Sequence, residues 1–195
     1  MMQSFLKFIE LGLYHVINFE VYELILFLIV ISISFLLNDW KRLITLISVF
    51  TLAYSLSLIL GLYDVISLNV NVSEWLIPIV IFFVAVYNIF TAAKSIKRRL
   101  YLLYGIVFFF SIIHGLGFAN TFATLMQSEE NTIFSVLEFS IGIEIGQFIV
   151  VICTLLLSYI FQSVFRFSNR DWILVVSCII LGFILPLILM TPIFS

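Results

Sequence analysis

The stretch "YLLYGIVFFFSIIHGLGFANTFAT" (residues 101–124) contains no Asp, Glu, Lys or Arg and consists mainly of aromatic and aliphatic residues. About 20 apolar residues in an α-helix cross the hydrocarbon core of a bilayer, so this stretch predicts a membrane-spanning helix. Its single histidine, His114, lies near the middle and is followed by Gly115 and Gly117. An ionisable group at that depth usually faces the interior of a helix bundle and has a partner there.

The composition of the whole chain supports a membrane location. The chain has 195 residues, of which 64% are hydrophobic and only 10% are charged, whereas soluble domains contain about 25% charged residues. The net charge of −2 does not indicate nucleic-acid binding. We therefore expect one all-α integral membrane domain over residues 1–195, in contact with the lipid bilayer.

Six stretches have the length and composition of a membrane span. A shorter segment, about residues 4–17, mixes apolar side chains with Lys7 and Glu10 and predicts an amphipathic helix lying in the membrane interface. The expected fold is a six-helix transmembrane bundle preceded by this short N-terminal interfacial helix. The six predicted spans are about 20–38, 43–62, 74–93, 101–124, 133–162 and 172–191.

The distribution of charge between the connections predicts the orientation. Basic residues follow the first, third and fifth spans, whereas the opposite side is acidic and has Lys7 as its only basic residue. Basic residues stay on the cytoplasmic side during insertion, so both termini are expected to be extracytoplasmic. The basic residues are Lys41, Arg42, Lys94, Lys97, Arg98, Arg99, Arg166 and Arg170, and the acidic ones Asp64, Glu74, Glu129 and Glu130.

Two ionisable residues lie near the midpoints of consecutive predicted spans. His114 and Glu144 could therefore meet at similar depth, and Gln147 lies three residues after Glu144 on the same helical face. An imidazole, a carboxylate and an amide at the membrane midplane could bind a divalent cation or relay a proton. A hydrogen bond between His114 and Glu144 that merely locks two helices together is the alternative, and the sequence leaves both open.

A second polar group and two pairs of glycines complete the candidate residues. His15, Glu20 and Glu23 lie close together at the entrance to the first span, where they could attract a cation or simply be solvated. The glycines at 142 and 146 form a GxxxG pair, which allows a neighbouring backbone to approach closely. Gly115 and Gly117 are expected to allow the same close packing beside His114.

Several motifs resemble those of the HupE/UreJ family of small polytopic membrane proteins. "HGLGFA" (114–119) followed by "SIGIEIGQ" (140–147) is similar to two consecutive family motifs. Upstream, "GLYHVINFEVYELILFL" (12–28), "FTLAYSLSL" (50–58) and "SEWLIPIVIFFVAVYNIF" (73–90) resemble the motifs of its first three helices. The resemblance covers almost the whole chain and implies a multi-pass protein of the bacterial inner membrane.

The resemblance also implies a transported metal, because the family is associated with nickel and cobalt uptake. The first histidine of the family pattern is present as His15, but the following aspartate–histidine pair reads Glu23–Leu24. Tyr54 stands where the second helix of the family carries a histidine. Leucine cannot replace an imidazole ligand, and tyrosine replaces it poorly for nickel or cobalt. The chain therefore keeps only part of the family's nitrogen donors.

Two functions follow from these residues. The first is a permease for a divalent transition metal such as nickel or cobalt, with no permanently bound cofactor. The outer residues His15, Glu20 and Glu23 would attract the ion, and the midplane residues His114, Glu144 and Gln147 would hold it transiently. The second is a non-transporting membrane subunit or assembly factor, acting as a homo-oligomer or with another membrane protein. No HExxH or GxSxG motif indicates an enzyme.

Overall fold

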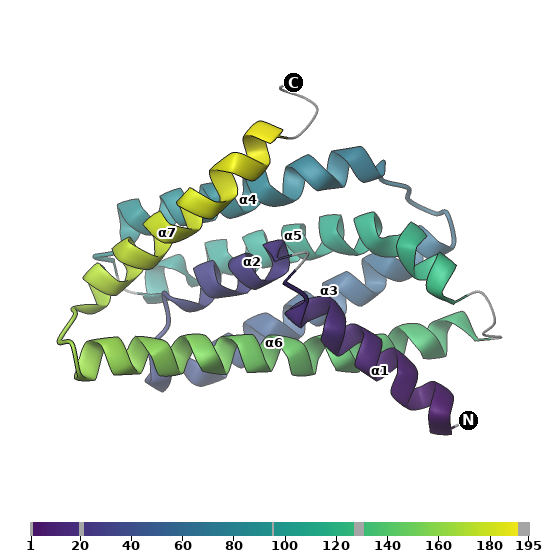
Figure 1. Cartoon of the computed structure of the whole chain (residues 1–195), viewed down its shortest axis with the longest axis horizontal. Coiled ribbons are helices and arrows are strands. Elements are labelled where there is room, and N and C mark those ends of the chain that lie inside the picture. Colours follow the sequence, from purple (N-terminus) through teal and green to yellow (C-terminus); the bar gives the residue numbers. More distant parts are fainter. Residues whose placement is uncertain (1, 20–21, 95, 127–130, 191–195) are drawn as a thin grey trace.

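The computed structural model describes residues 2–19, 22–94, 96–126 and 131–190. These residues form helices joined by short connections, and no strand occurs among them. Figure 1 shows α3, α4, α5 and α6 extending along the long axis of the molecule, with α7 inclined to them. In chain order the helices are α1 (Met2–Ile17), α2 (Glu23–Ser32), the 3-10 turn η1 (Leu37–Asp39), α3 (Trp40–Leu62), α4 (Val70–Thr91), α5 (Ile96–Leu125), α6 (Thr132–Ser163) and α7 (Asn169–Met190).

Five of these helices, α3 to α7, are long and apolar enough to cross a membrane. They correspond to the last five predicted spans, because long, mainly apolar stretches favour a helix whose backbone groups all bond internally. Helix α6 begins where Asn131 accepts a hydrogen bond from the backbone N–H of Phe134, as an N-cap residue does.

The first predicted span, about residues 20–38, is not confirmed as a spanning helix. Only Glu23–Ser32 is helical, and ten residues extend about 15 Å, half the thickness of a bilayer core. Beyond the helix, the side chain of Ser34 donates a hydrogen bond to Asn88 of α4 at 3.1 Å. Serine side chains compete with helical backbone bonding, and here a tertiary contact stabilises the non-helical chain.

The first helix, which the sequence predicts to lie in the membrane interface, packs closely against α6. A Cβ atom at Gly12 would overlap the carbonyl oxygen of Phe139, and one at Gly142 would overlap that of Ile9. These glycines let the backbones of α1 and α6 touch, so α1 is packed into the bundle. Figure 1 shows α1 inclined to α6, with α2 lying beyond its C-terminal end.

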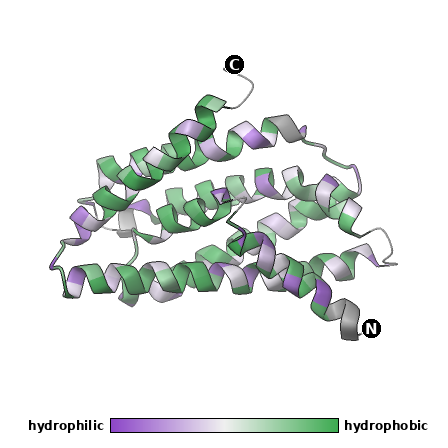
Figure 2. Cartoon of the chain, in the orientation of Figure 1, coloured by the Kyte–Doolittle hydropathy of each residue, from purple (hydrophilic) through white to green (hydrophobic). Residues whose placement is uncertain are grey.

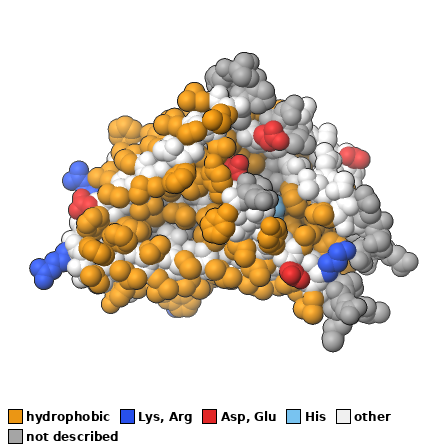
Figure 3. All heavy atoms as spheres, viewed as in Figure 1, with side chains coloured by type: hydrophobic (Ala, Val, Ile, Leu, Met, Phe, Trp, Pro, Cys, Tyr) orange, Lys and Arg blue, Asp and Glu red, His pale blue; other side chains and the backbone are white. Residues whose placement is uncertain are grey.

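The surface of the bundle is as apolar as its interior. Phe90 is 80% exposed and Leu52 is 71% exposed, although both lie within long helices. Figure 2 shows hydrophobic residues along every helix, and Figure 3 shows hydrophobic side chains covering most of the visible face. In a soluble protein this apolar surface would be exposed to water, which is unfavourable. In a membrane it contacts lipid. The fold is that of a multi-pass helical membrane protein.

Candidate functional site

The break between α1 and α2 brings polar groups into the middle of the bundle. His15 lies in the last turn of α1, and Glu23 is the first residue of α2. The last carbonyl groups of α1 and the first N–H groups of α2 have no partners within their own helices. A carboxylate is favoured at a helix N-terminus, where the helix dipole is positive, so Glu23 suits its position.

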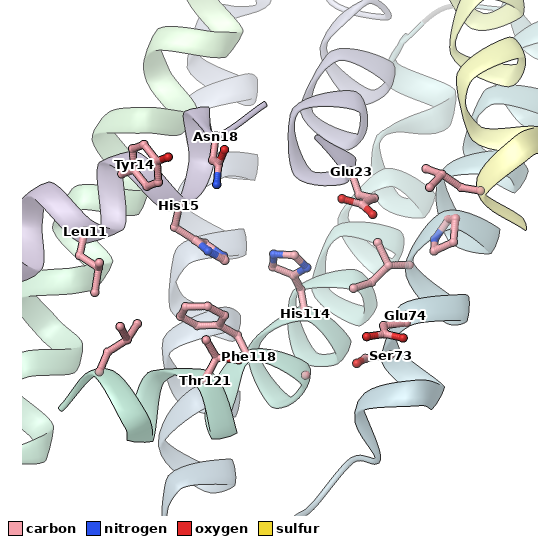
Figure 4. Close-up of a pocket in the computed structure, with 15 residues that line it drawn as sticks. Leu11, Tyr14, His15, Asn18, Glu23, Ser73, Glu74, His114, Phe118 and Thr121 are labelled. Carbon is pink, nitrogen blue, oxygen red and sulfur yellow. The ribbon is translucent and has the colours of Figure 1, made fainter. Parts of the chain in front are cut away.

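Two imidazoles from different helices face each other beside this break. The ring centroids of His15 in α1 and His114 in α5 lie 5.4 Å apart, with the ring planes tilted by 44°. The Nε2 atom of His15 lies 3.5 Å from the hydroxyl of Tyr54. Both ring nitrogens of His114 are buried without a hydrogen-bond partner. Figure 4 shows the two rings pointing toward each other across a gap.

The spacing of the two rings suits a shared cation. A transition-metal ion lies about 2.1 Å from an imidazole nitrogen, so two imidazoles on one tetrahedral ion have centroids about 5.3 Å apart. The observed 5.4 Å is close to that value. Within the described part of the chain, however, no three His, Cys, Asp or Glu side chains form a metal-binding group. Two protein nitrogens with water in the other positions are therefore the arrangement that this site can offer.

A cavity of about 690 Å³ leads to the two histidines. Glu23 and Glu74 line it, and no Lys or Arg occurs among its described lining residues. One carboxylate oxygen of Glu23 is buried and lacks a hydrogen-bond partner. In Figure 4 the carboxylates of Glu23 and Glu74 lie on the same side of His114, and His15 lies on the other. A cavity with carboxylates and no basic side chain favours a cation.

The cavity extends from the middle of the bundle toward one end of it. Its wall includes Thr121 and Leu125 in the last turns of α5, and Ser73 near the start of α4. Phe118 forms part of the same wall, with its ring centroid 4.2 Å from that of His15. Figure 3 shows histidine atoms in a hollow of the hydrophobic face, although His114 itself is buried.

Glu144 and Gln147 lie elsewhere, and the predicted hydrogen bond between His114 and Glu144 is absent. Glu144 accepts a hydrogen bond from the hydroxyl of Ser48 at 2.8 Å, and Gln147 accepts one from Thr51 at 3.3 Å. Both donors belong to α3. Helix α5 packs mainly along α3, whereas α6 packs mainly along α1, so the two consecutive helices do not bring these side chains together. Glu20 lies outside the described residues.

The four glycines singled out in the sequence lie at close helix contacts. Gly115 faces the backbone of Tyr54 in α3, whose carbonyl oxygen would lie 2.6 Å from an added Cβ atom. Gly117 faces Ser73 of α4, and Gly146 faces Val16 of α1. With Gly142, they hold α3 and α4 against α5, and α1 against α6.

Some residues near these contacts were not singled out from the sequence. Ser48, Thr51 and Ser55 recur at helical spacing in α3, a signal that could have indicated a polar face toward α6. Tyr54 stands where the family pattern has a histidine, and its ring contacts both His15 and His114. Glu138 in α6 is also buried, and no pattern in the sequence distinguishes it from a solvated helix-entry residue.

The fold and the cavity define a multi-pass helical membrane protein with a cation-compatible site between its helices. Comparison with family models then identifies the family: the model for the HupE / UreJ protein matches residues 1–191, and the chain belongs to that family. The family is generally linked to nickel and cobalt transport. Neither the curated proteins nor the solved structures contain a match to this chain.

Proposed function

We propose that this protein is a permease for a divalent transition-metal ion of the nickel or cobalt type. The observation that carries the proposal is the convergence of His15 and His114, from separate helices, on a cavity with no Lys or Arg among its described lining residues. Family membership supports the same class of cargo. Imidazole nitrogens suit nickel and cobalt, whereas magnesium and calcium prefer oxygen ligands alone.

In this proposal the ion enters the cavity past Glu74 and moves toward Glu23. The two carboxylates raise the local concentration of cations and offset part of the cost of removing water from the ion. His15 and His114 then hold the ion with two nitrogens while water fills its other positions. A transport site must bind weakly enough to release, so a sparse ligand set is compatible with passage.

We further propose that the protein lies in the inner membrane of a bacterium, with both termini extracytoplasmic. Arg166 and Arg170 follow the C-terminal end of α6, while Lys41 and Arg42 lie at the start of α3. Because α3 and α6 run in opposite directions, these basic residues lie at the same end of the bundle (Figure 1). The cavity extends toward the other end, so the positive-inside rule makes its opening extracytoplasmic.

Metal binding to the purified, detergent-solubilised protein tests this function. Isothermal titration calorimetry with nickel, cobalt, zinc and manganese should show saturable binding of at least one transition metal. Substitution of either histidine, His15→Ala or His114→Ala, should weaken binding about 100-fold, equivalent to about 2.7 kcal/mol. Glu144→Gln is the matched control, because Glu144 bonds to Ser48 in the α3–α6 contact and should leave affinity within about twofold.

Absence of saturable binding to the folded, unmodified chain would contradict the permease. That result would favour the alternative of a non-transporting membrane subunit. Co-purification of a membrane partner would then be the next measurement. Loss of binding in Glu144→Gln together with retention in His114→Ala would place the site at α6 and overturn the assignment to the cavity.

A further inference from the structure

Three helices repeat one pattern at the inner end of the cavity. Each carries a polar side chain near the cavity and a phenylalanine four residues away along the helix. Residues four apart lie one above the other on the same helical face. Because α2 runs opposite to α3 and α5, all three phenylalanines lie on the same side of the polar groups, away from the cavity opening (Figure 1). The pairs are Glu23 and Phe27 in α2, Tyr54 and Phe50 in α3, and His114 and Phe110 in α5.

The three phenylalanines form a closed layer. The rings of Phe27 and Phe110 stack with their centroids 3.5 Å apart and their planes at 6°. Phe50 completes the triangle, with its centroid 6.2 Å from Phe27 and 6.1 Å from Phe110. All three side chains are fully buried. The ring of Phe110 also stacks on His114, so the layer lies directly against the imidazole.

The space on the far side of this layer is small and apolar. Phe27 and Phe50 line it together with Ile31, Leu46 and Val107, one turn further along the same three helices. Its volume is about 10 Å³, against about 690 Å³ for the cavity on the near side. A site of that size holds at most one water molecule, and an apolar site stays dry. The bundle thus has a large cavity on one side of the layer and closely packed side chains on the other.

We infer that Phe27, Phe50 and Phe110 form the inner gate of the transport pathway, a hydrophobic barrier between the histidine site and the cytoplasm. An ion that has lost its water cannot enter a dry apolar layer without a large free-energy penalty, and hydrophobic constrictions close pores in this way. Movement of α2 against α5 would separate the stacked rings of Phe27 and Phe110. The inference rests on the proposed function, because a gate requires a pathway.

Cysteine accessibility tests the gate without any metal. The natural cysteines are first removed (Cys153→Ser, Cys178→Ser), and spheroplasts expressing the chain are treated from outside with a membrane-impermeant maleimide. Thr121→Cys, in the cavity wall, should react. Val107→Cys, beyond the layer, should not react. Adding Phe110→Ala to Val107→Cys should raise its labelling rate at least tenfold, and Phe110→Leu, which keeps an apolar side chain, should raise it less.

The matched control is Phe122→Ala, which removes a fully buried ring from the same helix in the cavity half of α5. It should leave Val107→Cys unreactive if the Phe110 effect comes from the gate and not from general loosening. Labelling of Val107→Cys with the layer intact, or equal labelling with Phe110→Ala and Phe122→Ala, would overturn the gate. An unreactive Thr121→Cys would instead contradict the outer entrance of the proposed function, and the gate with it. Failure to bind metal would not alter these labelling rates.

Discussion

Helices α5 and α6 each carry a glycine-rich motif around one ionisable residue at mid-length, yet they have opposite surroundings. In α5, His114 borders a cavity of about 690 Å³, and neither of its ring nitrogens has a hydrogen-bond partner. In α6, Glu144 is bonded to Ser48, and the glycines of its motif contact the backbone or side chains of α1. A buried polar group without a protein partner requires an explanation such as a water or an ion, whereas the bond of Glu144 to Ser48 is a structural contact.

The largest expected effect concerns the close contact of α6 with α1. Gly142→Leu should destabilise the protein by about 3 kcal/mol or more, because the new side chain would have to displace the backbone of α1. Thermal unfolding in detergent measures the change. Gly105→Ala in α5 is the control, since an added Cβ atom there has no neighbour within 4 Å. Equal unfolding temperatures for the two variants would contradict the tight α1–α6 contact.

The next largest effect concerns the cavity beside His114. Glu23→Gln keeps the size of the side chain but removes its charge from the cavity, and it should weaken cation binding about tenfold, or about 1.4 kcal/mol. Glu74→Gln is the control: Glu74 is exposed and therefore well screened by water, so its loss should cost less than threefold. Metal titration of both variants measures the ratio. A larger effect at Glu74 would move the binding site away from the histidines.

A double-mutant cycle tests the contact of Glu144. Ser48→Ala combined with Glu144→Gln should show a coupling free energy of about 0.6 kcal/mol, typical of a hydrogen bond between membrane helices. The same cycle with His114→Ala and Glu144→Gln should show none, because the structure contains no bond between these side chains. A coupling free energy between His114 and Glu144 larger than that between Ser48 and Glu144 would support the His114–Glu144 hydrogen bond, which the structure does not contain.

The smallest effect is expected at Tyr54. Its hydroxyl lies 3.5 Å from His15, a long contact that contributes little free energy. Tyr54→Phe should therefore change metal affinity by less than about threefold, or about 0.6 kcal/mol. Isothermal titration calorimetry of both proteins with the same metal measures the change in affinity. A loss of tenfold or more would identify the tyrosine as a ligand that replaces the histidine of the family pattern.

The sequence predicts the five long helices well because the signal is local. A long, mainly apolar stretch forms a helix whichever neighbours it acquires, since a helix satisfies its backbone groups internally in lipid. The predicted span at about residues 20–38 is not confirmed, because the structure of this region depends on contacts with distant parts of the chain. Helix α1 depends on Gly12 meeting α6, and the end of α2 depends on Ser34 bonding to Asn88 of α4. These contacts join segments far apart in the chain.

In the candidate site, too, some features follow from the local sequence and others depend on tertiary contacts. The position of His114 and Glu144 near the middle of their helices follows from the sequence, because each residue advances a helix by about 1.5 Å. Which neighbour each side chain meets is a matter of helix rotation and packing. Helix α6 is turned by the contact of Gly142 with α1, and Glu144 thereby faces α3. His114 instead meets His15, which the break after α1 leaves at the same depth.

The sequence alone thus determined a multi-pass membrane protein of the HupE/UreJ family and the approximate depth of its polar residues. Only the tertiary structure decided that His15 and His114 share a cavity, that Glu144 belongs to a helix contact, and that three phenylalanines pack together beside His114. The physical reason is that hydropathy depends on each stretch by itself, whereas partners depend on how helices rotate against one another. That rotation is set by close contacts between helices, many of them at glycines.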